Sequence, residues 1–207
     1  MKRFGSIVVA AAFAASACTT SRETSPPRTA TEQLLISTAA ERAAERIALP
    51  IQAGAKVFVD PTNFDGIDAK YAIAAIRDHL LRKGANLVAE RGHAEVIVEI
   101  RAGALAVDEH KTLVGIPRFD VPVPLAGAFT VPEIALFKRS ERLGVAKFVA
   151  TGYRASDGGF VGASDAEYGF AHKKDWVVLL FVSWTTDDVL PEGAGGSRID
   201  LEAPALP

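Results

Sequence analysis

The only cysteine of the chain, Cys18, stands where a bacterial cell would modify its thiol. An apolar run over residues 7–15 follows a basic start, and the small residues Ala15-Ser16-Ala17 directly precede the cysteine. A basic start, a short apolar stretch and small residues at the cut site are typical of a secretory signal. A cysteine directly after them indicates a lipoprotein signal, in which the thiol is lipidated and the cysteine becomes the new N-terminus. We therefore expect residues 1–17 to be a lipoprotein signal peptide and Cys18 to carry fatty acyl chains such as palmitate.

Ordinary signal cleavage is the alternative interpretation, because Ala15-Ser16-Ala17 also satisfies the A-x-A rule. It would leave Cys18 unpaired and exposed in an oxidising compartment. In both cases the apolar run is about nine residues long, too short to span a bilayer, which takes about 20 residues. The mature chain is thus expected to be anchored to a membrane by lipid, with residues 18–28 as a flexible tether. Thr19, in a position where aspartate would favour the inner membrane, favours the outer membrane, with the protein facing the periplasm.

Three side chains in the last quarter of the chain offer the best arrangement for nucleophilic catalysis. Ser164 lies in Gly162-Ala-Ser164-Asp-Ala166, which resembles the serine turn of hydrolases with alanine at its last position, and His172 and Asp175 follow. Such a turn joins a strand to a helix, and no helical pattern follows it here. We predict that the chain is not an enzyme, and keep a periplasmic hydrolase acting on cell-wall or lipid material as the alternative function.

Acidic residues and histidines predict neither a metal site nor a cofactor site. The turn from Asp60 to Asp68 is rich in carboxylates, but in the register of a calcium loop the first ligand falls on Pro61 and the closing glutamate on Ala72. The four histidines are scattered singly, without the spacing of zinc ligands. Without the signal peptide, 21 of the 23 basic residues remain against 25 acidic ones, a net charge of −4. A mildly acidic body offers no basic face for nucleic acid.

Two clusters of basic residues are the candidates for contact with a partner. One lies within residues 138–142, and Lys173 with Lys174 forms the other. On an anchored protein they could face anionic headgroups or an acidic partner, although a solvated hairpin end is the simpler interpretation. Trp176 and other aromatic residues favour the second cluster, because aromatic side chains are enriched at interfaces. Lys173, Lys174 and Trp176 are therefore the predicted partner-binding residues, and the expected partner is another envelope protein.

Helical and strand patterns alternate in the first half of the body. Thr29-x-x-Glu32 matches a capping box, and Ile36, Ala40, Ala43 and Ile47 recur at helical spacing, which predicts a helix to about residue 48. A strand is predicted over residues 55–60, and a second helix over residues 67–83 ends at Gly84. Two more strands are predicted over residues 86–90 and 94–103. Apolar and charged residues alternate in the last of these, which indicates a sheet with one buried face.

Prolines and glycines punctuate the second half. Residues 117–133 hold four prolines, which exclude a helix or a central strand, and their apolar side chains predict an ordered, packed loop. The segments 144–155 and 160–164, around a glycine-containing turn, predict a hairpin. The run from Trp176 to about Thr185 predicts a buried strand, and residues 191–207 a mobile tail.

Several blocks of the sequence resemble a family of uncharacterised bacterial lipoproteins. They are Arg28-Thr-Ala-Thr-Glu-Gln-Leu-Leu-Ile-Ser37, Lys56-Val-Phe-Val-Asp60, Pro124-Leu-Ala-Gly-Ala128 with Pro132-Glu-Ile134, and Lys138-Arg139 leading to Gly144-Val-Ala-Lys147. The resemblance spans about residues 28–190 and implies an envelope lipoprotein domain. It brings no established activity and no catalytic residue.

These patterns together predict one α/β domain over residues 29–190. We expect a mixed or mostly antiparallel sheet with two helices packed on one face. The expected function is that of a membrane-anchored envelope lipoprotein, acting as a non-enzymatic accessory, assembly or binding module.

Overall fold

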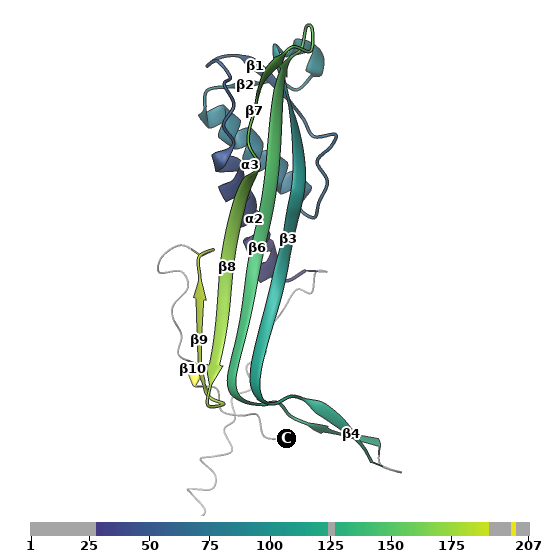
Figure 1. Ribbon diagram of the computed structural model, residues 1–207, viewed down its shortest axis with the longest axis vertical. Coiled ribbons are helices and arrows are strands. Elements are labelled where there is room, and N and C mark those ends of the chain that lie inside the picture. The colour runs from purple at the N-terminus through teal and green to yellow at the C-terminus, as the bar shows by residue number, and fades with distance from the viewer. Residues whose placement is uncertain (1–27, 124–126, 191–199, 202–207) are drawn as a thin grey trace, which may run out of the picture.

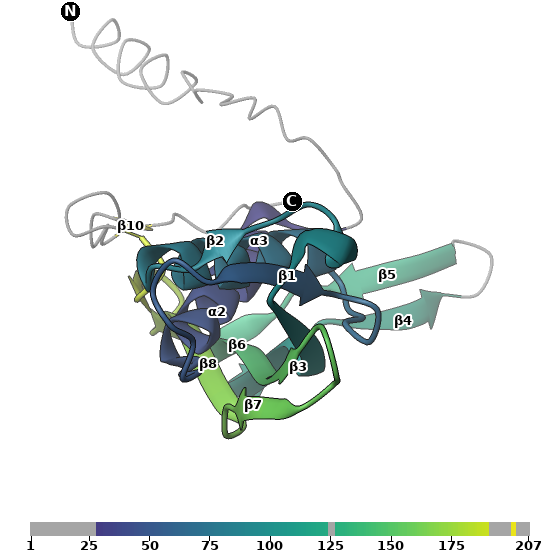
Figure 2. The same ribbon diagram turned by 90° about the horizontal axis from the view of Figure 1, so that it is seen from above.

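The computed structural model describes residues 28–123, 127–190 and 200–201. Its main sheet is mixed, with the strand order β10-β9-β8-β6-β3-β1-β2, and β7 pairs with β6. Figure 1 shows this sheet as long and narrow, with both helices behind it at one end, and Figure 2 shows them on the same face. The expected mixed sheet with two helices on one face is confirmed, although strands dominate the fold. The predicted signal peptide and nearly all of the predicted tether lie outside the described residues.

Helix α2 (Ala30–Arg46) begins at the predicted capping box. The Thr29 hydroxyl accepts a hydrogen bond from the Glu32 backbone N–H at 3.2 Å, and the Glu32 carboxylate accepts one from the Thr29 N–H at 2.9 Å. These bonds satisfy backbone donors that have no partner within the helix. The predicted apolar stripe is confirmed, because its four members are all buried: Ile36, Ala40, Ala43 and Ile47.

Replacing Thr29 by alanine is expected to lower the free energy of unfolding by about 1 kcal/mol, because the Glu32 N–H loses its acceptor. Urea unfolding followed by circular dichroism measures this change. Thr29→Ser keeps the hydroxyl and should retain nearly all of the stability. Equal losses in the two variants would show that the hydroxyl does not cap the helix.

A parallel unit forms the end of the sheet that the helices cover. Strand β1 (Lys56–Asp60) pairs in parallel with β2 (Asn86–Leu87) and with the start of β3, and helix α3 (Ala69–Arg82) connects β1 to β2. Gly84 ends the helix as predicted, with a φ of +94° that glycine adopts at low cost. The predicted strand over residues 86–90 is only two residues long, and a 3-10 turn (Arg91–His93) follows it.

Three antiparallel strands make up most of the sheet: β3 (Val96–Ile116), β6 (Ile134–Arg154) and β8 (Glu167–Val178). β3 and β6 pair along nearly their whole length of 21 residues each. At 3.3 Å per residue such a strand is roughly 70 Å long. The predicted strands over residues 94–103 and 144–155 are therefore only the ends of these strands nearest the helices, and the expected lengths were wrong. The predicted hairpin is confirmed as β6 followed by β7 (Phe160–Ala163).

Helix α2 rests directly on two glycines of the sheet. A Cβ added at Gly144 would lie 2.5 Å from the Leu35 carbonyl oxygen, and one added at Gly169 would lie 2.6 Å from the Ala43 nitrogen. Backbone therefore meets backbone at these points, which only residues without a side chain permit. The core lies between α2, α3 and this half of the sheet, and its largest fully buried side chains include Phe148, Leu35, Ile76 and Ile100.

The segment 117–133 is a β-hairpin and not a packed loop. β4 (Phe119–Val123) pairs with β5 (Gly127–Val131), and Figure 2 shows this two-stranded ribbon projecting sideways from the main sheet. Pro122 is tolerated because a two-stranded ribbon consists of edge strands, where a missing N–H can face solvent. The expected packing was wrong, since Phe119, Val121 and Phe129 are exposed.

The predicted buried strand from Trp176 to Thr185 is two strands joined by an exposed turn. β8 ends at Val178, residues 179–181 form the turn, and β9 (Val182–Asp187) returns beside β8. Strand β10 (Asp200–Leu201) pairs with β9, and the rest of the predicted mobile tail, residues 191–207, lies outside the described residues. Neither helix in the described part of the chain is long and apolar enough to span a membrane.

Candidate interaction surface

The structure separates the three residues of the hydrolase hypothesis. The Ser164 N–H donates to the Ala150 carbonyl, whereas His172 lies opposite Leu143 on the same strand β6. Seven residues of an extended strand span roughly 23 Å, so the serine and the histidine are far beyond hydrogen-bond reach. His172 and Asp175 are three positions apart on β8 and point to opposite faces of the sheet. A catalytic site built from these three residues is therefore excluded.

Hydrogen bonds of all three residues hold parts of the sheet together instead. The Ser164 hydroxyl accepts a hydrogen bond from the Ala150 N–H at 3.0 Å. Asp175 accepts bonds from the Thr185 hydroxyl at 2.6 Å and from Arg142 at 3.3 Å, which link three neighbouring strands. The His172 N–H donates to the Asp188 carboxylate at 2.7 Å.

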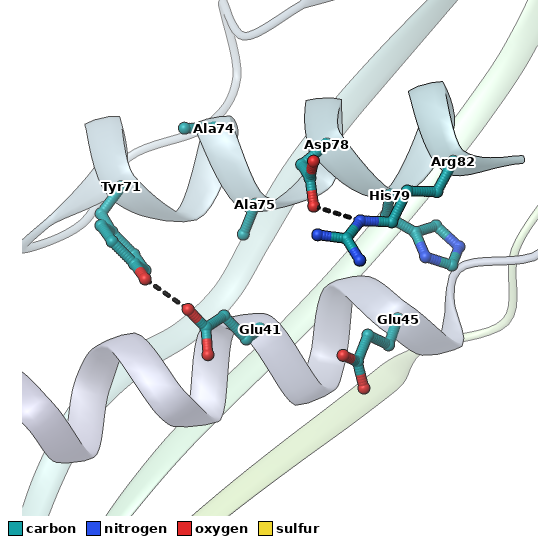
Figure 3. A pocket seen from close by; sticks show the side chains of 8 residues that line it. All are labelled: Glu41, Glu45, Tyr71, Ala74, Ala75, Asp78, His79 and Arg82. Carbon is teal, nitrogen blue, oxygen red and sulfur yellow. Dashed lines mark hydrogen bonds and ion pairs between the residues drawn. The ribbon is translucent and has the colours of Figure 1, made fainter.

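A cleft of about 450 Å³ lies between α2 and α3 (Figure 3). Its polar side chains pair with one another: the Tyr71 hydroxyl donates to Glu41, and Arg82 donates to Asp78 at 2.7 Å. His79, one of the four scattered histidines, is buried and donates from Nε2 to the Ile47 carbonyl at 2.9 Å. The bonds of Tyr71 and His79 hold the two helices together, and the Arg82–Asp78 pair lies within α3, so the cleft is not the best candidate for a ligand site.

The acidic turn between β1 and α3 also uses its carboxylates internally. Asp60 accepts from the Thr62 hydroxyl at 2.6 Å and pairs with Arg91, and Asp65 accepts from the Gly66 N–H at 2.8 Å. Among residues 28–123, 127–190 and 200–201, no group of three or more His, Cys, Asp or Glu side chains is arranged to hold a metal ion.

The predicted partner-binding residues divide between the two faces of β8. Lys173 points to the face of the helices, where its Nζ lies 3.5 Å from the Thr31 hydroxyl. Lys174 and Trp176 point to the opposite face, and Lys174 forms an ion pair with Glu141 at 3.0 Å. Neither helix packs on that face of the sheet (Figures 1 and 2).

Trp176 belongs to an aromatic cluster, which we define as Phe137, Trp176 and Trp184. The two indole rings stack with their centroids 5.9 Å apart, and the Phe137 ring meets Trp176 edge-on, also at 5.9 Å. The Arg139 guanidinium lies over the Trp176 ring at 4.9 Å from its centroid. Sequence reasoning missed Trp184 and Phe137. No sequence signal marked them, because the turn after Val178 that brings Trp184 directly opposite Trp176 contains no glycine, proline or asparagine.

The end of the sheet farthest from the helices is covered with exposed apolar side chains. We call this set the distal tip: Ile116, Phe119, Ile134, Leu136, Leu179, Leu180 and Phe181. Ile116 pairs with Ile134, and the N–H groups of Leu179 and Leu180 donate to the carbonyls of Leu136 and Ala135 at 2.9 and 3.1 Å. The ends of β3, β6 and β8 thus bring these residues together. In the turn itself, Leu179, Leu180 and Phe181 are 56%, 45% and 48% exposed.

The backbone of this turn is unfavourable for its residues. Leu179 and Leu180 have φ values of 52° and 73°, in the left-handed region that glycine and asparagine prefer. A side chain with a Cβ costs about 1–2 kcal/mol there. Two half-exposed leucines at these positions add little burial and no local backbone stability, and such strain is characteristic of functional sites.

The start of the folded body is fastened to α3 by an ion pair. Both terminal N–H groups of the Arg28 guanidinium donate hydrogen bonds to the Asp68 carboxylate. The hydrogen bond from Arg28 holds the pKa of Asp68 below its usual range, against the opposing effect of partial burial. The tether predicted for residues 18–28 therefore ends at a fixed point on the body.

This lowered pKa predicts an acid-dependent loss of stability. The Asp68 contribution is fully present above a pH of about 4 and is lost as the pH falls through the folded-state pKa. Asp68→Asn should therefore be less stable than the wild type at neutral pH, by less than about 1 kcal/mol for this partly exposed pair. The two proteins should converge once the pH is below the folded-state pKa of Asp68, and urea unfolding over a series of acidic pH values measures the difference. A stability gap that is independent of pH would contradict the assignment.

A family model, described as a family of unknown function (DUF6655), matches residues 15–179. The matched span contains the core, the three long strands and the aromatic residues Phe137 and Trp176. No curated protein matches the chain.

Proposed function

Because the chain belongs to the DUF6655 family, whose function is unknown, we propose a function from its own residues: a lipid-anchored, non-enzymatic binding module of the bacterial envelope. The N-terminal sequence supports the anchor, since Cys18 directly follows a signal-like segment. The mature chain is held at the outer membrane and faces the periplasm.

One observation carries the binding role. The aromatic cluster and its cations, Arg139 and Lys174, lie on a sheet face that neither helix covers. These side chains are half-buried, and aromatic and cationic side chains that reach the surface together are enriched where proteins meet other molecules. The hydrogen bonds of Ser164 and Asp175, the residues that suggested hydrolysis, support this interpretation as well, because they connect strands of the sheet.

Fractionation of a Gram-negative host that expresses the full chain tests the anchor. The wild type should remain with the membranes after a carbonate wash, whereas Cys18→Ser should be released from them in large part. Ser16→Ala is the matched control, because it keeps a small residue at the cut site and should behave like the wild type. Recovery of the wild type in the cytosol, or equal release of wild type and Cys18→Ser, would overturn the proposal.

A further inference from the structure

We infer that the distal tip inserts into the lipid surface of the membrane that carries the Cys18 anchor, so that the protein holds this membrane at two points. The inference rests on the proposed function for the anchor. The apolar end of the sheet would lie in the acyl and headgroup region of a bilayer.

The first argument is the composition of the turn. The turn between β8 and β9 contributes Leu179, Leu180 and Phe181 to the tip, and all three are exposed. Leu179 and Leu180 adopt a backbone conformation that favours glycine or asparagine. Polar residues would therefore be more favourable at these positions, both in contact with water and in this backbone conformation. The leucines are thus explained by a contact with another molecule. Burial in lipid is such a contact, since apolar side chains at an interface bind in proportion to their buried area.

The second argument is the order of side chains along the sheet. The aromatic cluster lies next to the tip, because Trp176 precedes the end of β8 by two residues, about 7 Å. Tryptophan is enriched where a protein passes from acyl chains to headgroups. Arg139, which lies over the Trp176 ring, is on the same face of β6, and Lys174 lies two residue pairs further from the tip. The series from apolar tip to aromatic ring to charged group matches the layers of a membrane surface.

The third argument is the reach of the N-terminal anchor. Helix α2 starts beside Lys173, since Thr31 contacts that side chain, and Lys173 is five residues from the end of β8. The start of the helix is therefore about 17 Å above the tip along the sheet. Arg28 is ten positions after Cys18, and a chain of that length spans at most about 35 Å. A lipid on Cys18 can thus enter the same bilayer plane as the tip.

A fluorescent label at the tip tests the inference in the lipidated full chain. Acylation consumes the thiol of Cys18, so Phe181→Cys introduces the only reactive thiol. The protein is reconstituted through its anchor into vesicles of phosphatidylethanolamine and phosphatidylglycerol, and an NBD label reports its surroundings. We expect blue-shifted emission that doxyl lipids quench about twofold or more. Phe160→Cys, at the opposite end of the sheet and 70% exposed, is the matched control and should show neither effect.

A second variant separates lipid binding from folding. Leu179→Asn with Leu180→Gly suits the positive φ values and should leave the stability unchanged or raise it. In the Cys18→Ser background, the same pair of substitutions should weaken vesicle binding by about tenfold, since it removes the apolar side chains. Leu81→Ser, at an exposed apolar position on α3, should bind vesicles as well as Cys18→Ser alone.

The outcomes distinguish the two proposals. If the label at residue 181 stays in water while the Cys18 anchor holds the protein on the vesicle, the inference fails and the anchor stands. A tip shielded from water only when other envelope proteins are present would also overturn it, in favour of a protein partner. If Cys18 itself takes up the label, the anchor fails, and vesicle binding by the Cys18→Ser protein then decides the role of the tip independently.

Discussion

Replacing Gly169 by alanine is expected to lower the free energy of unfolding by about 3 kcal/mol or more, because helix α2 has no room to accept a methyl group. The added Cβ would lie 2.6 Å from the Ala43 nitrogen and closer still to the Ala39 carbonyl oxygen. Both atoms belong to the backbone of the helix, so no side-chain rotation relieves the overlap. The helix must move away from β8, and the contacts between α2 and the sheet weaken along their length. Urea unfolding measures the loss.

Gly92→Ala is the matched control for this substitution. A Cβ at Gly92 meets nothing within 4 Å, so the stability should change by less than about 0.5 kcal/mol. If both alanine variants were equally stable, α2 would not lie against β8 as described.

Replacing Phe148 by alanine should lower the free energy of unfolding by about 3–5 kcal/mol. Phe148 is fully buried at the centre of the sheet, and its ring lies 5.2 Å from that of Phe64, centroid to centroid. The substitution removes a large apolar side chain and leaves a cavity among core residues that include Ile100. The midpoint of thermal or urea unfolding should fall accordingly.

Phe160→Ala makes the same chemical change at a site that is 70% exposed. Its loss should be less than about 1 kcal/mol, because little apolar surface leaves the solvent there on folding. A similar loss in both phenylalanine variants would contradict the position of the core.

The helices could be predicted from the sequence because their signals are local. A capping box at Thr29, a glycine stop at Gly84 and apolar residues every three or four positions define them without knowledge of their neighbours. The strands that pack under the helices, β1 and the first part of β3, could be predicted for a related reason. One buried face produces a visible alternation of apolar and polar residues.

The distal halves of β3 and β6 could not be predicted in this way. No helix covers them, so charged residues such as Asp108 and Arg142 lie on both faces of the sheet. Apolar and polar residues therefore do not alternate along these segments. Pairing between the strands holds these segments, and that pairing includes bonds from Arg142 to Glu109 at 3.0 Å and from Ser140 to Glu109 at 3.1 Å. Such cross-strand contacts join positions more than 30 residues apart, which a local pattern does not reveal.

The interaction surface could be predicted only in part. Lys174 and Trp176 were singled out, and both lie on the uncovered face of the sheet, whereas Lys173 lies on the other face. The distal tip was missed because Leu179, Leu180 and Phe181 lie within an unbroken apolar run, which is typical of a buried strand. Turn prediction relies on glycine, proline and asparagine, and this turn contains none of them.

The mass of the N-terminal peptide of the protein purified from bacterial membranes tests the proposed anchoring most directly. We expect a mature chain that begins at Cys18 and carries a diacylglyceryl group on its sulfur and an acyl chain on its amino group. A mature chain that begins at another residue, or a Cys18 with a free thiol, would contradict the proposal that this protein works at a membrane surface.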